Sequence, residues 1–266
     1  MTDLANATVL ITGATSGFGA AAANRFAADG ARLILVGRRN ERLDELKSKL
    51  GVPVLPLALD VRDRQAVARS IAELPDAFAR IDILVNSAGL ALGLEMAPKT
   101  SLDDWDDMVD TNIKGLMYCT RAILPGMVER KRGHVINLGS VAGSYPYPGG
   151  NVYGGTKAFV EQFSLGLRAD LLGSGVRVTN IEPGMCETEF SVVRFKGDPS
   201  QAAKVYQGMK PLSADDVAEC IHWVAALPDH VNINRIEVMP VQQAFGGFAV
   251  NRTPAGAEAG ATAKDR

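Results

Sequence analysis

The chain has few cysteines, almost no net charge and no long apolar run, and each of these shortages excludes a class of protein. Its three cysteines (Cys119, Cys186 and Cys220) are far apart and not in CxxC spacing. They indicate neither a disulfide framework nor a zinc site, and they suit a reducing compartment. The 28 basic and 30 acidic residues leave a net charge of −2. That balance gives no basic excess for nonspecific binding to nucleic acid or to an anionic membrane.

Features of membrane insertion and export are also missing. No apolar run approaches the length that spans a bilayer. Asp3 and the strand-like 8–11 stand where a signal peptide would have its basic and apolar regions. We therefore expect a cytoplasmic protein that binds neither membranes nor nucleic acid and holds no metal.

What the sequence does contain is a regular alternation of short apolar runs and longer amphipathic segments. The runs predicted as buried strands are 8–12, 32–36, 54–59, 81–86, 134–138 and 176–181. The segments with helical spacing are 19–29, 41–50, 63–78, 102–130, 152–172 and 214–226. Strands that are apolar throughout and alternate with helices predict a single-domain α/β fold, a Rossmann-like doubly wound parallel sheet flanked by helices.

Two stretches interrupt this alternation. Residues 185–212, rich in Gly, Lys and Pro, are too long for an ordinary connection, so we expect a mobile substrate lid there. Residues 253–266 contain no side chain more apolar than Ala and are expected to be a disordered tail. The folded domain is therefore expected to span residues 1–252.

A glycine-rich loop follows the first predicted strand and leads directly into the first helix. Such loops let backbone N–H groups approach a pyrophosphate at the positive end of a helix. The spacing is Gly-x3-Gly-x-Gly, which taken alone is also compatible with a plain turn. Its place between strand and helix favours a dinucleotide site formed by Gly13, Thr15, Ser16, Gly17, Phe18 and Gly19.

The end of the second strand bears on the choice of dinucleotide. An NAD-selective enzyme is expected to have Asp or Glu here for the ribose 2′-hydroxyl. This chain has Gly37 followed by Arg38 and Arg39. Guanidinium groups match a 2′-phosphate in charge and geometry. We therefore predict NADP as the cofactor, although two solvated loop arginines would look the same in sequence.

Further predicted cofactor contacts follow later strands, because ligands bind at the carboxyl ends of strands in open α/β sheets. After the third strand, Asp60 could accept a hydrogen bond from the adenine amino group, and Val61 adjoins it. Asn86, Ala88 and Gly89 follow the fourth strand, where small residues let the backbone approach the cofactor. Either group could also be an ordinary turn.

Tyr153 and Lys157 form the candidate catalytic pair. Residues four apart share a helix face, so the phenol and the ammonium can meet. A neighbouring cation favours the phenolate and would lower the pKa of a tyrosine from its usual value of about 10. A tyrosine tuned in this way can exchange a proton with a carbinol or carbonyl oxygen.

Two further polar residues complete this constellation. Ser140 ends the fifth strand, where its hydroxyl can polarise a substrate oxygen. Asn112 lies inside a long predicted helix, although asparagine is a mediocre helix former. A polar duty such as holding a water would explain it, and so would a helix kink or a core hydrogen bond.

The sequence at this point resembles the classical short-chain dehydrogenase/reductase family over nearly its whole length. The matching segments are Thr12-Gly13…Gly17-Phe18-Gly19, Asn86-Ser87-Ala88-Gly89, Asn112, Ser140, Tyr153-x3-Lys157 and Pro183-Gly184…Thr188. The resemblance implies that Tyr153 is the acid/base and that Lys157 lowers its pKa and binds the nicotinamide ribose. It likewise implies that Ser140 positions the substrate oxygen and that Asn112 anchors a water-linked proton relay. Pro183, Gly184, Met185 and Thr188 would surround the carboxamide, and the assembly would be a homotetramer.

Within the family, the chain is most similar to the branch of NADP-dependent 3-hydroxy acid dehydrogenases. The segments that carry this likeness are 90–93, 124–130, 148–154, 193–198 and 230–234. It implies oxidation of serine, L-allo-threonine or 3-hydroxypropionate at the β-hydroxyl, or reduction of malonic semialdehyde. A carbonyl reductase for a neutral ketone, sugar or acyl substrate stays open. So does a non-catalytic NADP(H)-binding regulator, although such proteins typically lack the tyrosine or the lysine.

Arg194, on the expected lid, is the candidate substrate-binding residue beside Ser140 and Tyr153. A 3-hydroxy acid needs its carboxylate neutralised, and a guanidinium can bind it through two hydrogen bonds when a lid closes. A solvated lid residue or a subunit contact would explain Arg194 equally well. The apolar 245–248 could also make a subunit contact, or be buried within its own subunit.

Overall fold

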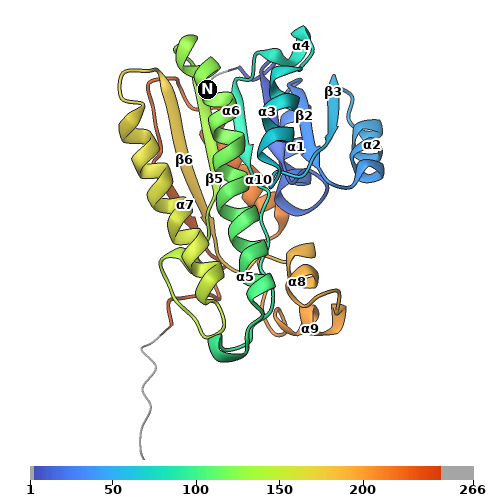
Figure 1. Cartoon of the computed structure of the whole chain (residues 1–266), viewed down its shortest axis with the longest axis vertical. Helices are drawn as coiled ribbons and strands as arrows, with labels where there is room; N and C mark the ends of the chain where they lie inside the picture. The colour runs from blue at the N-terminus through green and yellow to red at the C-terminus, as the bar shows by residue number, and fades with distance from the viewer. Residues whose placement is uncertain (1–2, 247–266) are drawn as a thin grey trace, which may run out of the picture.

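The computed structural model describes residues 3–246, which form one parallel sheet between two layers of helices (Figure 1). The sheet has seven parallel strands in the order β3-β2-β1-β4-β5-β6-β7. The strands are β1 Thr8–Thr12, β2 Arg32–Gly37, β3 Val54–Ala58, β4 Ile83–Asn86, β5 Gly133–Leu138, β6 Val176–Pro183 and β7 Arg235–Val238. The predicted doubly wound α/β architecture is confirmed.

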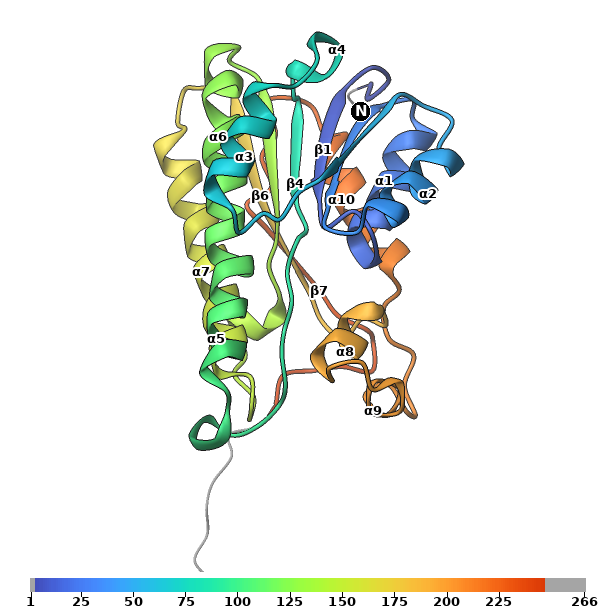
Figure 2. The same cartoon turned by 45° about the vertical axis from the view of Figure 1, so that its right-hand side comes forward.

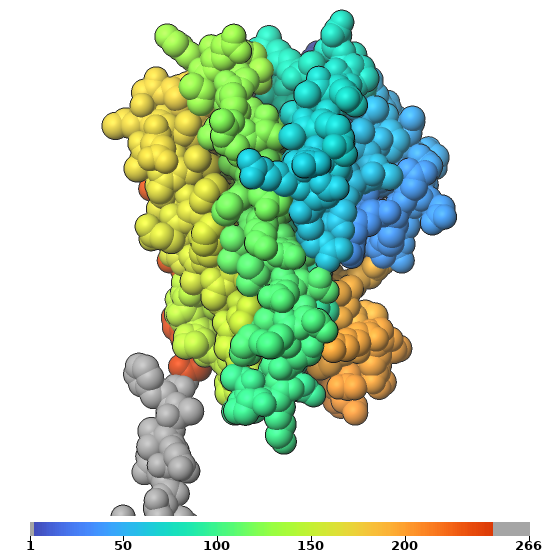
Figure 3. All heavy atoms as spheres, in the orientation of Figure 1, coloured from blue at the N-terminus to red at the C-terminus, as the bar shows by residue number. Residues whose placement is uncertain are grey.

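Helices cover both faces of the sheet. They are α1 Gly17–Ala28, α2 Asn40–Lys49, α3 Arg64–Ala72, α4 Asp76–Ala79, α5 Leu102–Val109, α6 Leu116–Glu129, α7 Asn151–Asp170, α8 Glu189–Arg194, α9 Pro199–Lys204 and α10 Ala214–Ala225. Helices α3, α6 and α7 pack on one face, and α1, α2 and α10 on the other, as the turned view shows (Figure 2). Figure 3 shows α7, α5 with α6, and α3 side by side across the first face.

Both faces of the central strands are buried because helices cover both. In β1, Val9 and Ile11 belong to the core under α1 and α10, while Leu10 belongs to the core under α3, α6 and α7. All five residues of β1 are buried. This two-sided burial is why the strands are apolar throughout and could be predicted from the sequence.

Several predicted boundaries were wrong. The single helix predicted at 102–130 is interrupted by a π-helical turn, Asp110–Gly115, between α5 and α6. The helix predicted at 63–78 is two helices, α3 and α4, and Pro75 is the N-cap of α4. Proline disfavours the helical conformation of the residue before it, so one helix does not continue through this point. Strand β7 was not predicted. It is an edge strand of only four residues that are alternately exposed and half-buried, so it lacks the apolar run by which the other strands were recognised.

The expected lid at 185–212 contains α8 and α9, and its first and last residues are hydrogen-bonded to each other. Leu212 donates its N–H to the Met185 carbonyl over 3.0 Å, and Glu187 donates to the Leu212 carbonyl over 2.9 Å. This closed base ties the segment to the sheet, while its mobility stays a prediction. The expected tail at 253–266 and the end of the predicted domain lie outside the described residues. Within residues 3–246, no helix is long and apolar enough to cross a membrane.

Candidate active site

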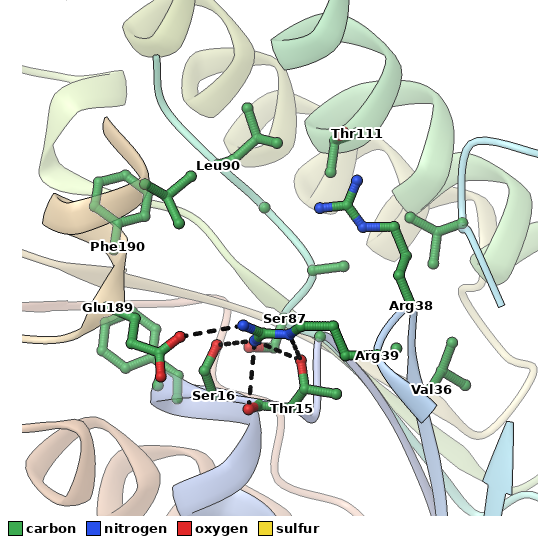
Figure 4. Close-up of a pocket in the computed structure, with 18 of the residues that line it drawn as sticks. Thr15, Ser16, Val36, Arg38, Arg39, Ser87, Leu90, Thr111, Glu189 and Phe190 are labelled. Atoms are coloured by element: carbon green, nitrogen blue, oxygen red, sulfur yellow. Dashed lines mark hydrogen bonds and ion pairs between the residues drawn. The ribbon is translucent and has the colours of Figure 1, made fainter. Parts of the chain in front are cut away.

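A cavity of about 250 Å³ lies at the carboxyl ends of β1, β2, β3 and β4. The predicted cofactor-binding residues that line it are Gly13, Thr15, Ser16, Gly17, Phe18, Arg38, Arg39, Asp60, Val61, Ala88, Gly89 and Thr188. Lid residues, among them Glu189 and Phe190, close its other side (Figure 4). Four separate loops and the lid therefore meet around one elongated site.

The glycine-rich loop is shaped by close backbone packing. Gly13 has φ +68, and a Cβ there would lie 2.8 Å from the Ala88 Cα. The Thr12 hydroxyl accepts hydrogen bonds from the backbone N–H groups of Ser87 (3.1 Å) and Ala88 (3.0 Å). Gly19 does not line the cavity, because it packs against the Gly13 carbonyl. Together these contacts hold the start of α1, with its unpaired N–H groups, toward the cavity.

The two arginines after β2 take different positions. Arg39 lies across the glycine-rich loop and donates from Nη2 to the hydroxyls of Thr15 (2.8 Å) and Ser16 (3.2 Å). Its Nη1 lies 3.4 Å from the Glu189 carboxylate. Arg38 points away from this group (Figure 4) and makes no hydrogen bond or salt bridge within residues 3–246. Arg38 is thus the guanidinium with free donors at the adenosine end.

Two other predicted contacts are placed unexpectedly. The Asn86 side chain points into the core, where it donates to Thr120 Oγ1 and Asn137 Oδ1, each over 2.9 Å. Asn86 does not line the cavity, whereas Ala88 and Gly89 of the same segment do; the approach of this backbone to a cofactor stays a prediction. Asp60 does line the cavity, but its carboxylate already accepts hydrogen bonds from Arg62. Burial raises the pKa of Asp60, but the hydrogen bonds and charge of Arg62 outweigh burial and hold that pKa below its ordinary value.

Tyr153 and Lys157 lie in the first turns of α7, as predicted. The Lys157 Nζ is 5.8 Å from the centre of the Tyr153 ring and donates to the Leu138 carbonyl over 2.7 Å. It also lies 3.6 Å from where a Cβ on Gly89 would be, next to the cavity loop. The lysine therefore reaches the boundary between the tyrosine and the fourth-strand loop.

Their protonation differs from the expectation. Burial raises the pKa of Tyr153 to about 12, against the opposing influence of the Arg194 guanidinium and the Ser140 hydroxyl. Burial also lowers the pKa of Lys157 to about 8. The prediction of a lowered tyrosine pKa was wrong for the protein alone, because loss of solvation outweighs the nearby cations.

Ser140 and Asn112 approach the pair from two sides. Ser140 begins the turn Val141–Gly143, and its Oγ accepts from the Ala142 N–H over 3.1 Å. Asn112, in the π-helical turn, donates to the Leu90 carbonyl (2.8 Å) and to Thr156 Oγ1 (3.0 Å), and accepts from the Leu90 N–H (2.9 Å). The Asn112 side chain therefore connects the loop after β4 to α7. This is the core hydrogen bonding that the sequence left open as one explanation of the residue.

Arg194 reaches the Tyr153 ring from the lid. Its guanidinium carbon lies 5.0 Å from the centre of the Tyr153 ring and 5.1 Å from that of Phe190, and Nη2 donates to Tyr147 Oη over 2.8 Å. Its Nε is buried without a hydrogen-bond partner, and no carboxylate among the described residues pairs with it. An unpaired guanidinium donor beside the phenol is a fitting receptor for an anion.

The segment after β6 forms the far end of the site. Gly184 donates to the Val238 carbonyl over 2.7 Å, and the Met185 N–H donates to Gln243 Oε1 over 2.7 Å. Thr188 caps α8 by accepting from the Phe190 N–H over 3.2 Å. Of the four residues expected around the carboxamide, Thr188 lines the cavity, whereas Pro183, Gly184 and Met185 do not.

Other reactive side chains show no activation. Burial raises the pKa of both Cys119 and Cys186 to about 12, so their thiols stay protonated. His134 is buried and pairs with Thr179 Oγ1 over 2.8 Å. Across residues 3–246, no group of three or more His, Cys, Asp or Glu side chains is arranged to hold a metal ion.

Comparison with known proteins identifies the family. A family model described as short chain dehydrogenase matches residues 7–198. The chain belongs to the short-chain dehydrogenase family. This short-chain dehydrogenase is 59% identical over 246 residues to the NADP-dependent 3-hydroxy acid dehydrogenase YdfG of Salmonella typhi, covering 92% of this chain and 99% of that protein. It is 58% identical over 245 residues to the serine 3-dehydrogenase of Rhizobium radiobacter, covering 92% and 98%.

Solved structures agree with this relationship. The closed form of a serine dehydrogenase complexed with NADP+ is 58% identical, with a TM-score of 0.91 over 92% of this chain and all of that one. The serine dehydrogenase from Escherichia coli is 53% identical, with a TM-score of 0.80 over 90% of this chain.

Several residues of this short-chain dehydrogenase site were not predicted. Glu189 pairs with Arg42 (2.7 Å) as well as Arg39, and joins the lid to the loop after β2. Phe190 packs on Tyr153, with ring centres 5.6 Å apart. The acidic residue after Thr188 and the arginine one helical turn after Arg39 were visible in the sequence. Nothing local showed that the chain brings them together from 147 positions apart.

Proposed function

We propose that this short-chain dehydrogenase is an NADP-dependent oxidoreductase for short 3-hydroxy acids. It would oxidise the β-hydroxyl of serine, L-allo-threonine or 3-hydroxypropionate, or reduce a corresponding semialdehyde such as malonic semialdehyde. The observation that carries this proposal is the Arg194 guanidinium, which lies 5.0 Å from the Tyr153 ring with its Nε buried and unpaired. The names of the YdfG and serine 3-dehydrogenase relatives support the same substrate class.

The cavity fits a dinucleotide with a 2′-phosphate. Gly13 leaves no space for a side chain beside Ala88, which keeps the cradle open to a pyrophosphate at the start of α1. Gly37 replaces the acid that would repel a 2′-phosphate, and the free Arg38 donors are available to bind one. Arg39 supports the same region through Thr15 and Ser16. These features support NADP rather than NAD.

The proposed mechanism assigns each catalytic side chain one task. NADP, held by the glycine-rich loop and Arg38, would supply the hydride acceptor for oxidation of the β-carbon and the hydride donor for reduction of the semialdehyde. Tyr153 Oη takes the hydroxyl proton in oxidation and gives it to the carbonyl oxygen in reduction. Ser140 Oγ donates a hydrogen bond to the same oxygen, and the Lys157 ammonium stabilises the tyrosinate. Asn112 keeps the loop after β4 in register with α7.

Arg194 would set the substrate class within this mechanism. A carboxylate bound to its Nε and Nη atoms places the β-carbon of a three- or four-carbon acid near Tyr153 Oη. The Phe190 and Tyr147 rings beside the guanidinium limit access of water to that ion pair. A neutral alcohol would offer no charged partner to this guanidinium and would gain no binding energy from it.

We further propose a homotetramer in the cytoplasm. Exposed apolar side chains on α5, on α7 and just after α7 support a subunit interface: Leu102 is 69% exposed, Leu165 42% and Leu172 80%. Helices α5 and α7 form part of the face shown in Figure 3. Phe245, 61% exposed, stacks on Tyr145 within the chain, with ring centres 4.4 Å apart; its continuation at 247–248 lies outside the described residues.

Substitution of Arg194 tests the proposal directly. In Arg194→Gln we expect KM for 3-hydroxypropionate to rise by about tenfold or more, because truncation leaves the carboxylate without its charged partner. The kcat/KM for a neutral secondary alcohol should change by less than about threefold. The matched control is Lys204→Gln, which removes an exposed cation from α9 on the same segment. Equal losses for acids and neutral alcohols in Arg194→Gln would refute the carboxylate role.

A further inference from the structure

Arg235, far from the cofactor cavity, is the centre of a network of polar contacts at the edge of the sheet. It lies on β7 and donates to four side chains. The acceptors are Glu182 Oε2 (2.6 Å), Glu161 Oε1 (2.8 Å), Ser144 Oγ (2.8 Å) and Glu237 Oε2 (3.1 Å). Nothing in the proposed mechanism uses this arginine or its partners.

The partners belong to the elements that carry the catalytic residues. Ser144 ends the short turn that begins at Ser140. Glu161 lies on α7, about two helical turns beyond Tyr153. Glu182 stands in β6, immediately before the segment that leads to the lid. Arg235 thus connects the Ser140 turn, α7 and β6 to one another.

Glu182 anchors the arginine from within the protein. Its side chain is 1% exposed and accepts a second hydrogen bond from Asn180 Nδ2 over 2.6 Å. Burying a carboxylate is costly, and a buried ion pair is often no more stabilising than apolar residues in its place. Retaining such a pair therefore points to a demand for fixed geometry. Asn180 and Glu182 also border Gly139, where a Cβ would lie 2.6 Å from Asn180 Oδ1.

The opposite side of the Ser140 turn is fixed by backbone packing. A Cβ on Gly143 would lie 2.9 Å from the Ala158 nitrogen, and one on Gly154 would lie 2.8 Å from the Ala142 carbonyl oxygen. The turn therefore packs on the first turns of α7 without intervening side chains. Turn and helix are also joined directly, because Ser144 Oγ donates to Glu161 Oε2 over 3.4 Å. The shorter Arg235 contacts to Ser144 and Glu161 add a charged link between the same two side chains.

We propose that Arg235, held in place by Glu182, is a positioning residue that sets Ser140 relative to Tyr153 and Lys157. This role rests on the proposed oxidoreductase function but is independent of the substrate and of Arg194. It predicts that loss of Arg235 lowers the rate of the chemical step while cofactor binding stays intact. None of the Arg235 contacts reaches the cavity lining.

The first arm of the test is kinetic. In Arg235→Gln, we expect kcat for NADPH-dependent reduction of malonic semialdehyde to fall by about 10- to 100-fold, as small displacements of catalytic groups do. The KM for NADPH should stay within about threefold of the wild-type value. Arg235→Lys should have a kcat between those of Arg235→Gln and the wild type, because lysine keeps the positive charge but has fewer hydrogen-bond donors than arginine. Arg25→Gln is the matched control, because Arg25 makes only surface contacts to Asp29 and Glu219.

A double-mutant cycle separates positioning from a general loss of structure. If Arg235 acts through Ser140, adding Arg235→Gln to Ser140→Ala should cost less than about threefold more in kcat. Independent, multiplying losses would overturn the proposal. Should Arg235→Gln fail to fold, Glu182→Gln removes the buried carboxylate that holds Arg235 and leaves the Ser144–Glu161 hydrogen bond in place. A loss of kcat that is likewise absent in the Ser140→Ala background then carries the same conclusion.

Amide hydrogen exchange gives a readout that does not need turnover. Arg235→Gln should lose protection at residues 140–150, whereas Arg25→Gln should not. If the wild-type protein reduces only a neutral ketone, the substrate proposal fails, and the cycle is run on that ketone. If it reduces nothing, exchange decides alone. Unchanged protection at 140–150 together with unchanged kcat would overturn the positioning role.

Discussion

At the scale of single residues, the same loss of solvation acts on the two catalytic groups in opposite directions. It raises the pKa of the Tyr153 phenol to about 12 and lowers that of the Lys157 ammonium to about 8. At neutral pH the tyrosine is therefore protonated and the lysine still mostly charged. A protonated phenol beside an ammonium is ready to donate to a carbonyl oxygen, which favours reduction of a semialdehyde.

The pH dependence of reduction follows from these two values. We expect kcat for NADPH-dependent reduction to decline as the pH rises above about 8. The decline arises because Lys157 loses its proton there and no longer stabilises the tyrosinate left by proton donation. The measurement is a pH–rate profile of wild type and Lys157→Met at saturating NADPH. A decline near pH 8 that persists in Lys157→Met would assign it to another group.

Residues within one motif could be predicted from sequence, and their partners elsewhere in the chain could not. The Tyr153–Lys157 spacing places both on one helix face, because helix geometry is local. The pKa of Tyr153 depends instead on burial by other elements, which raises it, and on Arg194 from the lid, which lowers it. The core position of Asn86 likewise depends on Thr120 and Asn137 from other elements.

At the scale of elements, two-sided burial decided what the sequence predicted. Strands β1, β2, β4, β5 and β6 are mostly apolar because helices cover both faces, and all five were predicted. The half-buried β3 was predicted as well, since its residues are also apolar. The edge strand β7 carries Arg235 and Glu237 in alternation with half-buried residues, so its four positions give no comparable signal. The π-helical turn that presents Asn112 differs from an α-helix by a shift in hydrogen bonding that the apolar pattern does not record.

Glu182 makes the β6–β7 edge sensitive to pH. Burial raises its pKa to about 7, against the influence of Arg235; Glu161 on α7 and Glu237 on β7 raise it further. Below pH 7 Glu182 takes up a proton and loses the charge that holds Arg235. We therefore expect kcat to fall as pH drops from about 8 to 6 in the wild type.

Glu182→Gln imitates the protonated state at every pH. It should show the low acid-limit kcat throughout and no change between pH 6 and 8. Glu237→Gln is the control, because it removes a more exposed carboxylate from the same arginine. A fall in kcat below about pH 7 that is unchanged in Glu182→Gln would exclude Glu182 as the group responsible.

At the scale of the whole molecule, the parallel sheet brings the site together. Loops after β1 to β4 form the cofactor cavity, and the turns after β5 and β6 bring Ser140 and the lid to the same edge. This arrangement follows from a doubly wound topology, so the location of the site could be predicted once the strands were recognised. How the lid lies over the cavity could not, since Glu189, Arg194 and Lys196 meet distant partners in Arg42, Tyr153 and Asp104.

The central claim is that this molecule transfers hydride between NADP and a 3-hydroxy acid. The most direct measurement is NADPH formation by the purified protein with L-serine, L-allo-threonine and 3-hydroxypropionate. NAD and a neutral secondary alcohol serve as the cofactor and substrate controls. We expect turnover of the acids with NADP and little or none with NAD. Turnover of the neutral alcohol alone, or NADPH binding without turnover of any substrate, would contradict the claim.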